Sequence, residues 1–168
     1  MHLTKCEKSQ LHKEFDSVIE NNQGRIRHIV SRYCTPEEFE DMYQEILLQL
    51  WRSFDSFKNH SSRETWLYKV ALNTACTFVS KNIKNRALDD TLSNLNIQDE
   101  QQGQESCQAD ILTNFMKTLG DIDANVLMMY LDGITSEGMA EVIGIKASAV
   151  RARLKRIKQS YQQQYIGE

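Results

Sequence analysis

Residues that interrupt helices are scarce in this sequence, which has a single proline, Pro36, and seven glycines among 168 residues. So few helix breakers favour a mostly helical chain with short connections. Long apolar runs are also missing: no segment approaches the roughly 20 residues that span a bilayer. The first ten residues lack the apolar stretch of a signal peptide. We therefore expect an all-α, cytoplasmic protein.

Patterns that would indicate a metal site or an active site are absent as well. The four cysteines and four histidines lie far apart, with no CxxC or HxxxH spacing, which predicts a reduced protein without metal or other cofactor. There is no paired-carboxylate, nucleophile–base or glycine-rich phosphate-binding pattern, so we do not expect an enzyme. We interpret Cys34, Cys76 and Cys107 as small apolar core residues rather than oxidant sensors.

The net charge is only −3, but the charges are unevenly distributed. Residues 88–118 carry six acidic residues and one basic residue, and most of this segment is polar, rich in glutamine and free of aromatic residues. Such a composition is typical of a flexible linker. We therefore predict two small helical domains, residues 1–87 and 111–168, joined by a flexible acidic linker at residues 88–110.

The N-terminal domain has the strongest helical periodicity. Apolar residues recur at i, i+3, i+4 and i+7 across residues 39–54, directly after a capping threonine, Thr35. Similar patterns predict helices at about residues 11–33 and 64–83. Helices with apolar faces of this width are expected to pack as a helical bundle, here around three aromatic residues: Trp51, Phe54 and Trp66.

The C-terminal domain has the pattern of a helix-turn-helix. A short helix within residues 134–143 precedes a turn at Gly144 and a basic helix at residues 149–158, the order found in motifs that read duplex DNA. We expect its inward face to consist of Met139, Ala140, Ile143, Val150, Leu154 and Ile157. Before it, Phe115, Met116 and Leu119 should pack against Val126, Leu127, Tyr130 and Leu131.

Two sets of residues together resemble a known family. Phe39-Glu-Asp-Met-Tyr-Gln-Glu-Ile-Leu-Leu-Gln-Leu-Trp51, with residues 54–57 and 65–75, resembles the second domain of bacterial extracytoplasmic-function (ECF) sigma factors. Residues 131–144 with 149–153 resemble their fourth domain. The resemblance implies a protein that binds core RNA polymerase, recognises the minus-thirty-five and minus-ten promoter elements, supports promoter melting and initiates transcription of a specific regulon. It also implies an anti-sigma factor as a probable partner.

The resemblance implies roles for individual residues in the N-terminal domain. The family's polymerase-docking helix face corresponds to Asp41, Gln44, Glu45, Leu48 and Gln49. Asn73 corresponds to the asparagine that lines the pocket for a flipped minus-ten base, and an amide suits this role because it both donates and accepts hydrogen bonds. The other predicted minus-ten contacts are Lys58 and Arg63 in the specificity-loop segment, and Lys69 and Lys81 on the following helix.

In the C-terminal domain the resemblance assigns minus-thirty-five binding to the basic helix. Arg151, Lys155 and Arg156 correspond to residues that read bases, and Arg or Lys can bind guanine O6 and N7. Ser148 and Arg153 are expected to contact the phosphate backbone, as is Lys158.

Other interpretations of the same residues stay open. Asp41 and Glu45 could form a solvated helix face, Asn73 could be a surface polar residue, and Tyr68 could stack on a base or pack internally, whereas Trp66 is expected in the core. For the whole chain, the alternatives are an autonomous dimeric helix-turn-helix transcription regulator and a helical adaptor that binds an acidic protein. Salt-sensitive promoter binding that requires polymerase would separate these possibilities.

Overall fold

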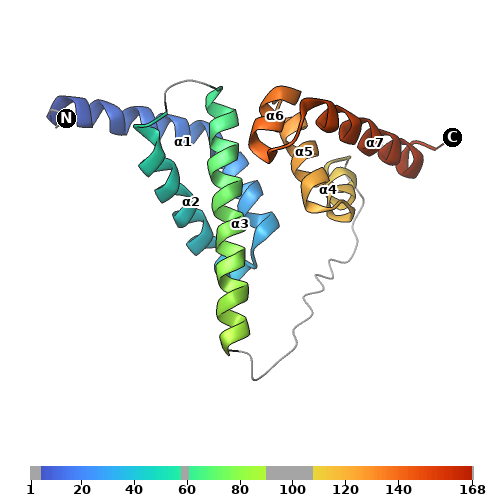
Figure 1. Ribbon diagram of the computed structural model, residues 1–168, viewed down its shortest axis with the longest axis horizontal. Coiled ribbons are helices and arrows are strands. Elements are labelled where there is room, and N and C mark those ends of the chain that lie inside the picture. The colour runs from blue at the N-terminus through green and yellow to red at the C-terminus, as the bar shows by residue number, and fades with distance from the viewer. Residues whose placement is uncertain (1–4, 58–60, 90–107, 168) are drawn as a thin grey trace. The chain divides into compact units, whose positions relative to one another are not determined.

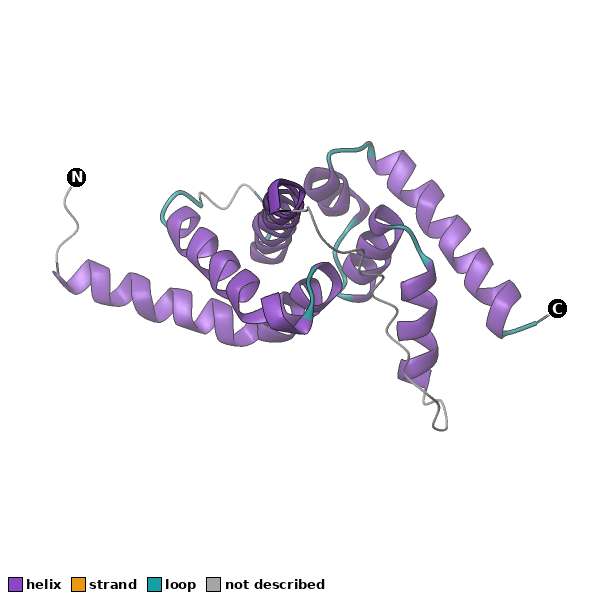
Figure 2. Cartoon of the chain, turned by 90° about the horizontal axis from the view of Figure 1, so that it is seen from below, coloured by secondary structure: helices purple, strands orange, loops and turns teal. Residues whose placement is uncertain are grey.

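The structure is a computed structural model that describes residues 5–57, 61–89 and 108–167 (Figure 1). Every regular element in these residues is a helix, which confirms the all-α fold (Figure 2). The chain divides into two compact units, Met1–Leu92 and Ser93–Glu168. Most of the predicted linker, together with Lys58, lies outside the described residues. Among the described helices, none is both long and apolar enough to cross a membrane.

The N-terminal unit contains three long helices: α1 (Lys5–Tyr33), α2 (Phe39–Phe54) and α3 (Arg63–Asp89). A short 3-10 turn, η1 (Pro36–Glu38), precedes α2. Each long helix packs against the other two, which forms the predicted bundle (Figure 1). Residues that are fully buried come from all three helices and include Ile26, Ile29, Met42, Ile46, Leu50 and Leu67.

Two helix boundaries differ from those predicted. The first helix begins at Lys5 rather than near Leu11, and the third ends at Asp89 rather than near Ile83. The added segments are polar, so they show no apolar periodicity, yet their lysine, glutamate, alanine and leucine residues are good helix formers. Periodicity therefore located the packed part of each helix and missed its polar extension.

The aromatic residues of the bundle form a connected cluster. Phe54 and Trp66 are buried, with ring centroids 6.0 Å apart, as predicted. Trp51 is only partly buried and lies at the margin of the core, where Phe15 packs edge-on at 5.0 Å and the His12 ring lies at 4.5 Å. The cluster thus fixes α1, α2 and α3 against one another.

Glu38 joins the start of α2 to α3. Its carboxylate accepts hydrogen bonds from the backbone amide and hydroxyl of Thr35, at 3.4 and 3.3 Å, and from Asn82 Nδ2 on α3 at 2.9 Å. Pro36 occupies the first turn, where a missing amide hydrogen costs nothing. These contacts hold α2 and α3 side by side at this end.

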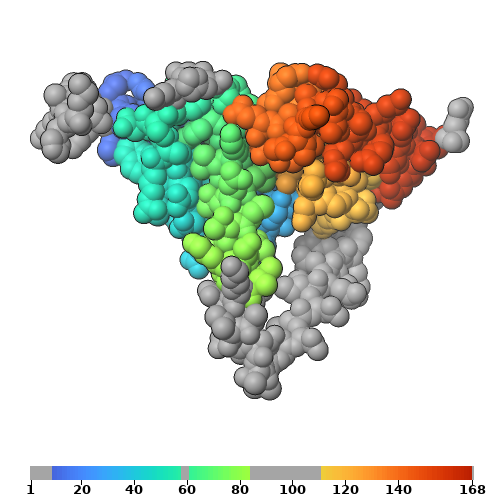
Figure 3. Space-filling model, viewed as in Figure 1, coloured from blue at the N-terminus to red at the C-terminus, as the bar shows by residue number. Residues whose placement is uncertain are grey.

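The C-terminal unit contains four helices: α4 (Gln108–Thr118), α5 (Asp121–Leu131), α6 (Ser136–Ile143) and α7 (Ala147–Tyr165). Helix α5 packs against the other three, so residues 124–129 are buried around its whole circumference. The space-filling view shows α6 and α7 as one continuous packed surface (Figure 3). The core includes Phe115, Val126, Met129, Met139, Val150 and Leu154.

Two expectations about this core are wrong. Tyr130 and Leu131, at the C-terminal end of α5, are 41% and 51% exposed and line an open groove with residues of α4 and α7 rather than a closed core. On α6, Val142 is buried and the expected inward residue Ile143 is partly buried, so the apolar face of the helix includes both.

The predicted helix-turn-helix is present as α6 and α7. The Thr135 hydroxyl caps α6 by accepting a hydrogen bond from the Gly138 amide at 3.1 Å. Gly144 ends α6 in the left-handed conformation, with φ of 80°, and donates its amide hydrogen to the Ala140 carbonyl at 2.9 Å. Only two residues separate this glycine from the start of α7.

Candidate nucleic-acid and protein interfaces

One side of α2 carries all five residues predicted to bind polymerase. Their spacing of three or four residues places them on the same helix face. Asp41, Gln44 and Leu48 are exposed. Glu45 and Gln49 are half-buried beside α3. Leu48 is 41% exposed and therefore presents an apolar contact within a polar face, as is common in protein interfaces.

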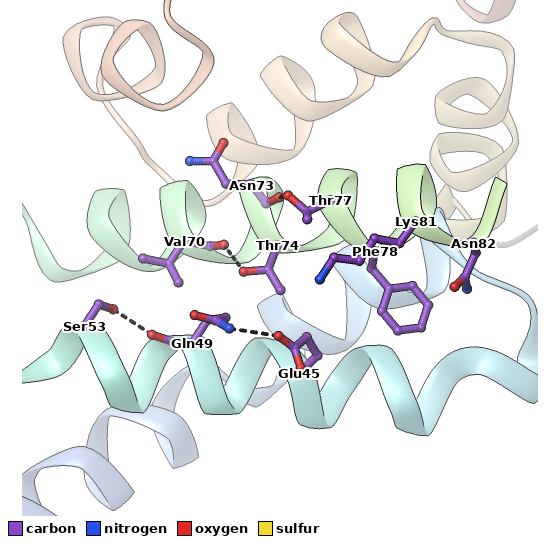
Figure 4. Close-up of a pocket in the computed structure, with 10 residues that line it drawn as sticks. All are labelled: Glu45, Gln49, Ser53, Val70, Asn73, Thr74, Thr77, Phe78, Lys81 and Asn82. Carbon is purple, nitrogen blue, oxygen red and sulfur yellow. Dashed lines mark hydrogen bonds between the residues drawn. The ribbon is translucent and has the colours of Figure 1, made fainter. Parts of the chain in front are cut away.

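An open groove of about 670 Å³ runs between α2 and α3 (Figure 4). Glu45 and Gln49 line its α2 side, and the Gln49 amide donates a hydrogen bond to the Glu45 carboxylate at 2.8 Å. The Lys81 side chain extends from α3 toward α2. The groove lining includes residues from both the predicted polymerase-binding set and the predicted minus-ten-binding set. The full lining consists of Glu45, Gln49, Ser53, Val70, Asn73, Thr74, Thr77, Phe78, Lys81 and Asn82.

Asn73 lies on the rim of this groove, exposed, with its amide directed away from α2 (Figure 4). Lys69, one turn earlier on α3, is also exposed, and Arg63 is exposed at the start of the helix. These cations and the amide therefore reach solvent from one helix, whereas Lys58 is outside the described residues.

Two aromatic residues earlier on α3, Trp66 and Tyr68, are not available to stack on a base. Tyr68 is fully buried, and Trp66 is 9% exposed. Of the two roles left open for Tyr68, the structure selects internal packing, and it confirms core packing for Trp66.

The residues of the basic helix α7 that are predicted to contact DNA do not all point in the same direction. At 100° per residue, four exposed positions share one outward face: Ser148, Arg151, Lys155 and Arg156. Arg153 is turned toward α5, where Nη1 donates to Asp123 Oδ1 at 2.6 Å, and its side chain is 31% exposed. Arg153 is therefore one predicted DNA contact that the structure does not bring to that outward face.

Lys158 flanks the other side of the buried stripe of α7. Its ammonium donates to the Tyr130 hydroxyl at 2.8 Å and lies 4.1 Å from the Tyr130 ring centroid. Arg153 and Lys158 thus contact α5 from the two edges of the buried stripe and help to hold α7 in place.

Comparison with known proteins places both units. Residues 18–85 match the family Sigma-70 region 2. ECF RNA polymerase sigma-E factors of Haemophilus influenzae and Escherichia coli K12 are each 22% identical to this chain, covering 88% of it and 85% or 84% of their own lengths. Residues 18–85 therefore form a Sigma-70 region 2 domain, and the chain as a whole is similar to ECF sigma factors.

Solved structures show the same fold. The sigma factor RpoE of Bartonella quintana, in complex with the anti-sigma factor NepR, superposes with a TM-score of 0.71 at 17% identity, over 90% of this chain and 96% of that one. CnrH, in complex with the cytosolic domain of CnrY, gives a TM-score of 0.61 at 14% identity, over 92% of each chain.

The segment that matches region 2 contains most of α1, all of α2 and most of α3. It includes both the α2 face and Asn73, whereas α4 to α7 lie outside the matched segment. The assignment of individual residues on α7 therefore depends on the geometry of the helix-turn-helix.

Sequence reasoning missed Glu137. Its carboxylate, in the first turn of α6, accepts a hydrogen bond from Arg151 Nη2 on α7 at 2.5 Å. A glutamate in the first turn of a helix is common, so no sequence signal linked Glu137 to an arginine 14 residues away.

Cys34 and Cys76 differ in environment. Cys76 is exposed on α3, so the expectation that it fills the core is wrong. Cys34 is partly buried, and its thiol donates to the Val30 carbonyl at 3.2 Å. Burial, and secondarily the nearby Glu38 carboxylate, raise the pKa of the Cys34 thiol.

Proposed function

We propose that this protein is a dissociable specificity subunit of RNA polymerase that acts in the cytoplasm without catalysis of its own. It binds core polymerase, recognises the minus-thirty-five and minus-ten elements and supports promoter melting. The observation that carries this proposal is the groove in the region 2 segment, where the predicted docking face of α2 adjoins the predicted base-binding face of α3.

The α2 face fits a protein partner. Its exposed carboxylate and amide groups surround an exposed leucine, Leu48, which combines polar specificity with a small apolar contact. Core polymerase docks on Asp41, Gln44, Glu45, Leu48 and Gln49. Docking here places the polymerase beside the groove that holds the melted strand.

The α3 face fits a single strand. Lys69, Lys81 and Arg63 supply cations for the phosphate backbone, and the exposed amide of Asn73 reads a base edge. Because Tyr68 and Trp66 are buried, base capture by the described part of α3 depends on hydrogen bonding rather than on stacking on these two rings. Lys58 extends this surface in the proposal.

The outward face of α7 fits the major groove. Arg151, Lys155 and Arg156 read the minus-thirty-five bases, and Ser148, near the N-terminus of α7, binds phosphate. Arg153 contributes indirectly, since its contact with Asp123 fixes α7 on α5.

An anti-sigma factor is a further partner in this proposal. The RpoE and CnrH structures each contain such a regulatory chain or its cytosolic domain. In the present chain, an apolar groove of about 690 Å³ between α4, α5 and α7 offers a protein-binding surface on the C-terminal unit. Its rim includes the exposed residues Tyr130, Leu131 and Ile166.

Run-off transcription tests the proposal. Core polymerase from the same organism is incubated with genomic fragments, with and without this protein, and discrete new transcripts are expected only in its presence. Asn73→Ala, Arg151→Ala and Leu48→Ala should each reduce them, whereas Asp16→Ala, on the exposed side of α1, should not. Absence of transcripts together with polymerase-independent binding to duplex DNA would instead identify an autonomous dimeric regulator.

A further inference from the structure

Glu137 on α6 contacts the side chain that the proposed function assigns to base reading on α7. Its Oε1 accepts a hydrogen bond from Arg151 Nη2 at 2.5 Å. The two side chains are 67% and 59% exposed, so the contact lies on the outer surface of the helix-turn-helix. Arg151 is on the same outward face of α7 as Ser148 and Lys155.

The fold sets the backbone position of Glu137 independently of Arg151. The Thr135 cap fixes the first turn of α6, and a carboxylate there interacts favourably with the positive end of the helix. The left-handed Gly144 sets the turn, and Val150 and Met139 are buried where α6 and α7 pack. The helix-turn-helix itself therefore brings the Glu137 side chain within reach of Arg151.

A guanidinium group can serve Glu137 and a base at once. Arginine has five N–H donors in a rigid fork, and the contact with Glu137 is made through Nη2. Guanine needs two donors, one for O6 and one for N7. The remaining donors of Arg151 suffice for that pair while the carboxylate limits the rotation of the fork.

The carboxylate also changes which ligands Arg151 favours. An arginine with a bound carboxylate has little net charge to attract a phosphate, and the carboxylate itself repels phosphate oxygens. Guanine O6 and N7 are neutral acceptors and escape most of this repulsion. The pair should therefore disfavour sequence-independent backbone contacts more than contacts with a guanine.

We propose that Glu137 is a positioning residue that makes Arg151 selective for a guanine in the minus-thirty-five element. The inference rests on the proposed function, because it assigns a base-reading role to Arg151. Stability does not explain the contact, since ion pairs between exposed side chains contribute little to folding.

The test uses holoenzyme assembled from core polymerase and the full chain. A promoter library randomised at the minus-thirty-five element first yields the wild-type preference, and the promoter affinity is then compared with that of variants in which each guanine is replaced. In Glu137→Gln, we expect discrimination at one guanine to fall by about fivefold or more, while affinity for unrelated duplex DNA rises. Arg151→Lys should lose discrimination at the same position, because an ammonium lacks the fork.

Two controls isolate the effect. Glu141→Gln removes the same charge from the exposed side of α6 one turn later, and it should leave discrimination at that guanine unchanged. Glu137→Gln in an Arg151→Ala background should have no further effect on discrimination. The inference is overturned if Glu137→Gln keeps the wild-type ratio within twofold, or if Glu141→Gln lowers that ratio equally.

Failure of the proposed function gives a different result. A wild-type holoenzyme that selects no minus-thirty-five sequence would contradict the sigma role itself. A wild-type holoenzyme that selects a sequence without a guanine dependent on Arg151 would contradict only the inference about Glu137.

Discussion

Arg153 is separated from the other cations of α7 by its contact with Asp123 on α5. Both side chains are about 30% exposed, at 31% and 29%, so removing one leaves a partly desolvated charge without its partner. We expect Arg153→Ala to lower the free energy of unfolding by about 1–2 kcal/mol in chemical denaturation. Lys155→Ala is the matched control and should leave stability unchanged while weakening promoter binding. Equal stability of the two variants would contradict a structural role for Arg153.

The two described cysteines should differ in reactivity. Alkylation requires the thiolate, and the pKa of Cys34 is raised by burial and by Glu38, whereas Cys76 is exposed. At pH 8 we expect iodoacetamide to modify Cys76 several times faster than Cys34, as measured by peptide mass spectrometry. Because the pKa of Cys34 is higher in the folded state, its contribution to stability is present below the unfolded-state pKa and lost as pH rises through the folded-state pKa. Faster labelling of Cys34 would contradict this environment.

At the residue scale, sequence patterns indicated which side chains are candidates for binding DNA, but not which side chains they contact within the fold. They predicted both Arg151 and Arg153 to bind DNA from one basic helix, but only the packing of α7 on α5 and α6 separates their environments. The partners Glu137 and Asp123 lie 14 and 30 residues away in sequence, beyond the reach of helical periodicity. Tyr68 likewise needed the packed bundle before stacking on a base could be excluded.

Alanine substitutions at two glycines, Gly24 and Gly144, should change stability in opposite directions, and this difference tests the backbone conformations of α1 and of the end of α6. Gly24 lies inside α1, and a Cβ there would meet nothing within 4 Å, so Gly24→Ala should stabilise the N-terminal unit by about 0.5–1 kcal/mol. Gly144 has equal space but a φ of 80°, and Gly144→Ala should destabilise the C-terminal unit by about 1–2 kcal/mol through backbone strain. Thermal unfolding of both variants measures the difference. The same sign of effect in both would contradict one of the two backbone conformations.

At the element scale, the number and order of the packed helices could be predicted from apolar spacing. The ends could not, because the residues at the start of α1 and the end of α3 are mostly polar and show no apolar periodicity, although many of them favour helices. The exposed end of α5 shows the converse limit. Tyr130 and Leu131 fit an apolar pattern, yet they line an open groove between α4, α5 and α7 and stay 41% and 51% exposed.

At the scale of the whole molecule, the two proposed promoter contacts lie in different compact units: Asn73 in Met1–Leu92 and Arg151 in Ser93–Glu168. Sequence resemblance assigned both roles as predictions, but only the structure shows that Asn73 shares a groove with Glu45 and Gln49 of the predicted polymerase-docking face. Contacts within that groove should therefore be coupled to one another, and contacts in separate units should not.

Because Asn73 and Arg151 lie in different compact units, we can predict how the effects of substituting both residues combine. In the proposal, Asn73 acts on the melted strand and Arg151 acts on duplex DNA. The free-energy costs of Asn73→Ala and Arg151→Ala for open-complex formation should then add in the double variant to within about 0.5 kcal/mol. Distant sites without shared partners are independent of each other. The matched comparison is Asn73→Ala combined with Lys81→Ala. Both residues line one groove, so the free-energy costs of these two substitutions should not be additive. Rates of open-complex formation on a duplex promoter, followed by the permanganate reactivity of unpaired thymines, measure both cycles. A coupling of more than 1 kcal/mol between Asn73 and Arg151 would instead mean that engagement of the minus-thirty-five element changes how the first unit captures the melted strand.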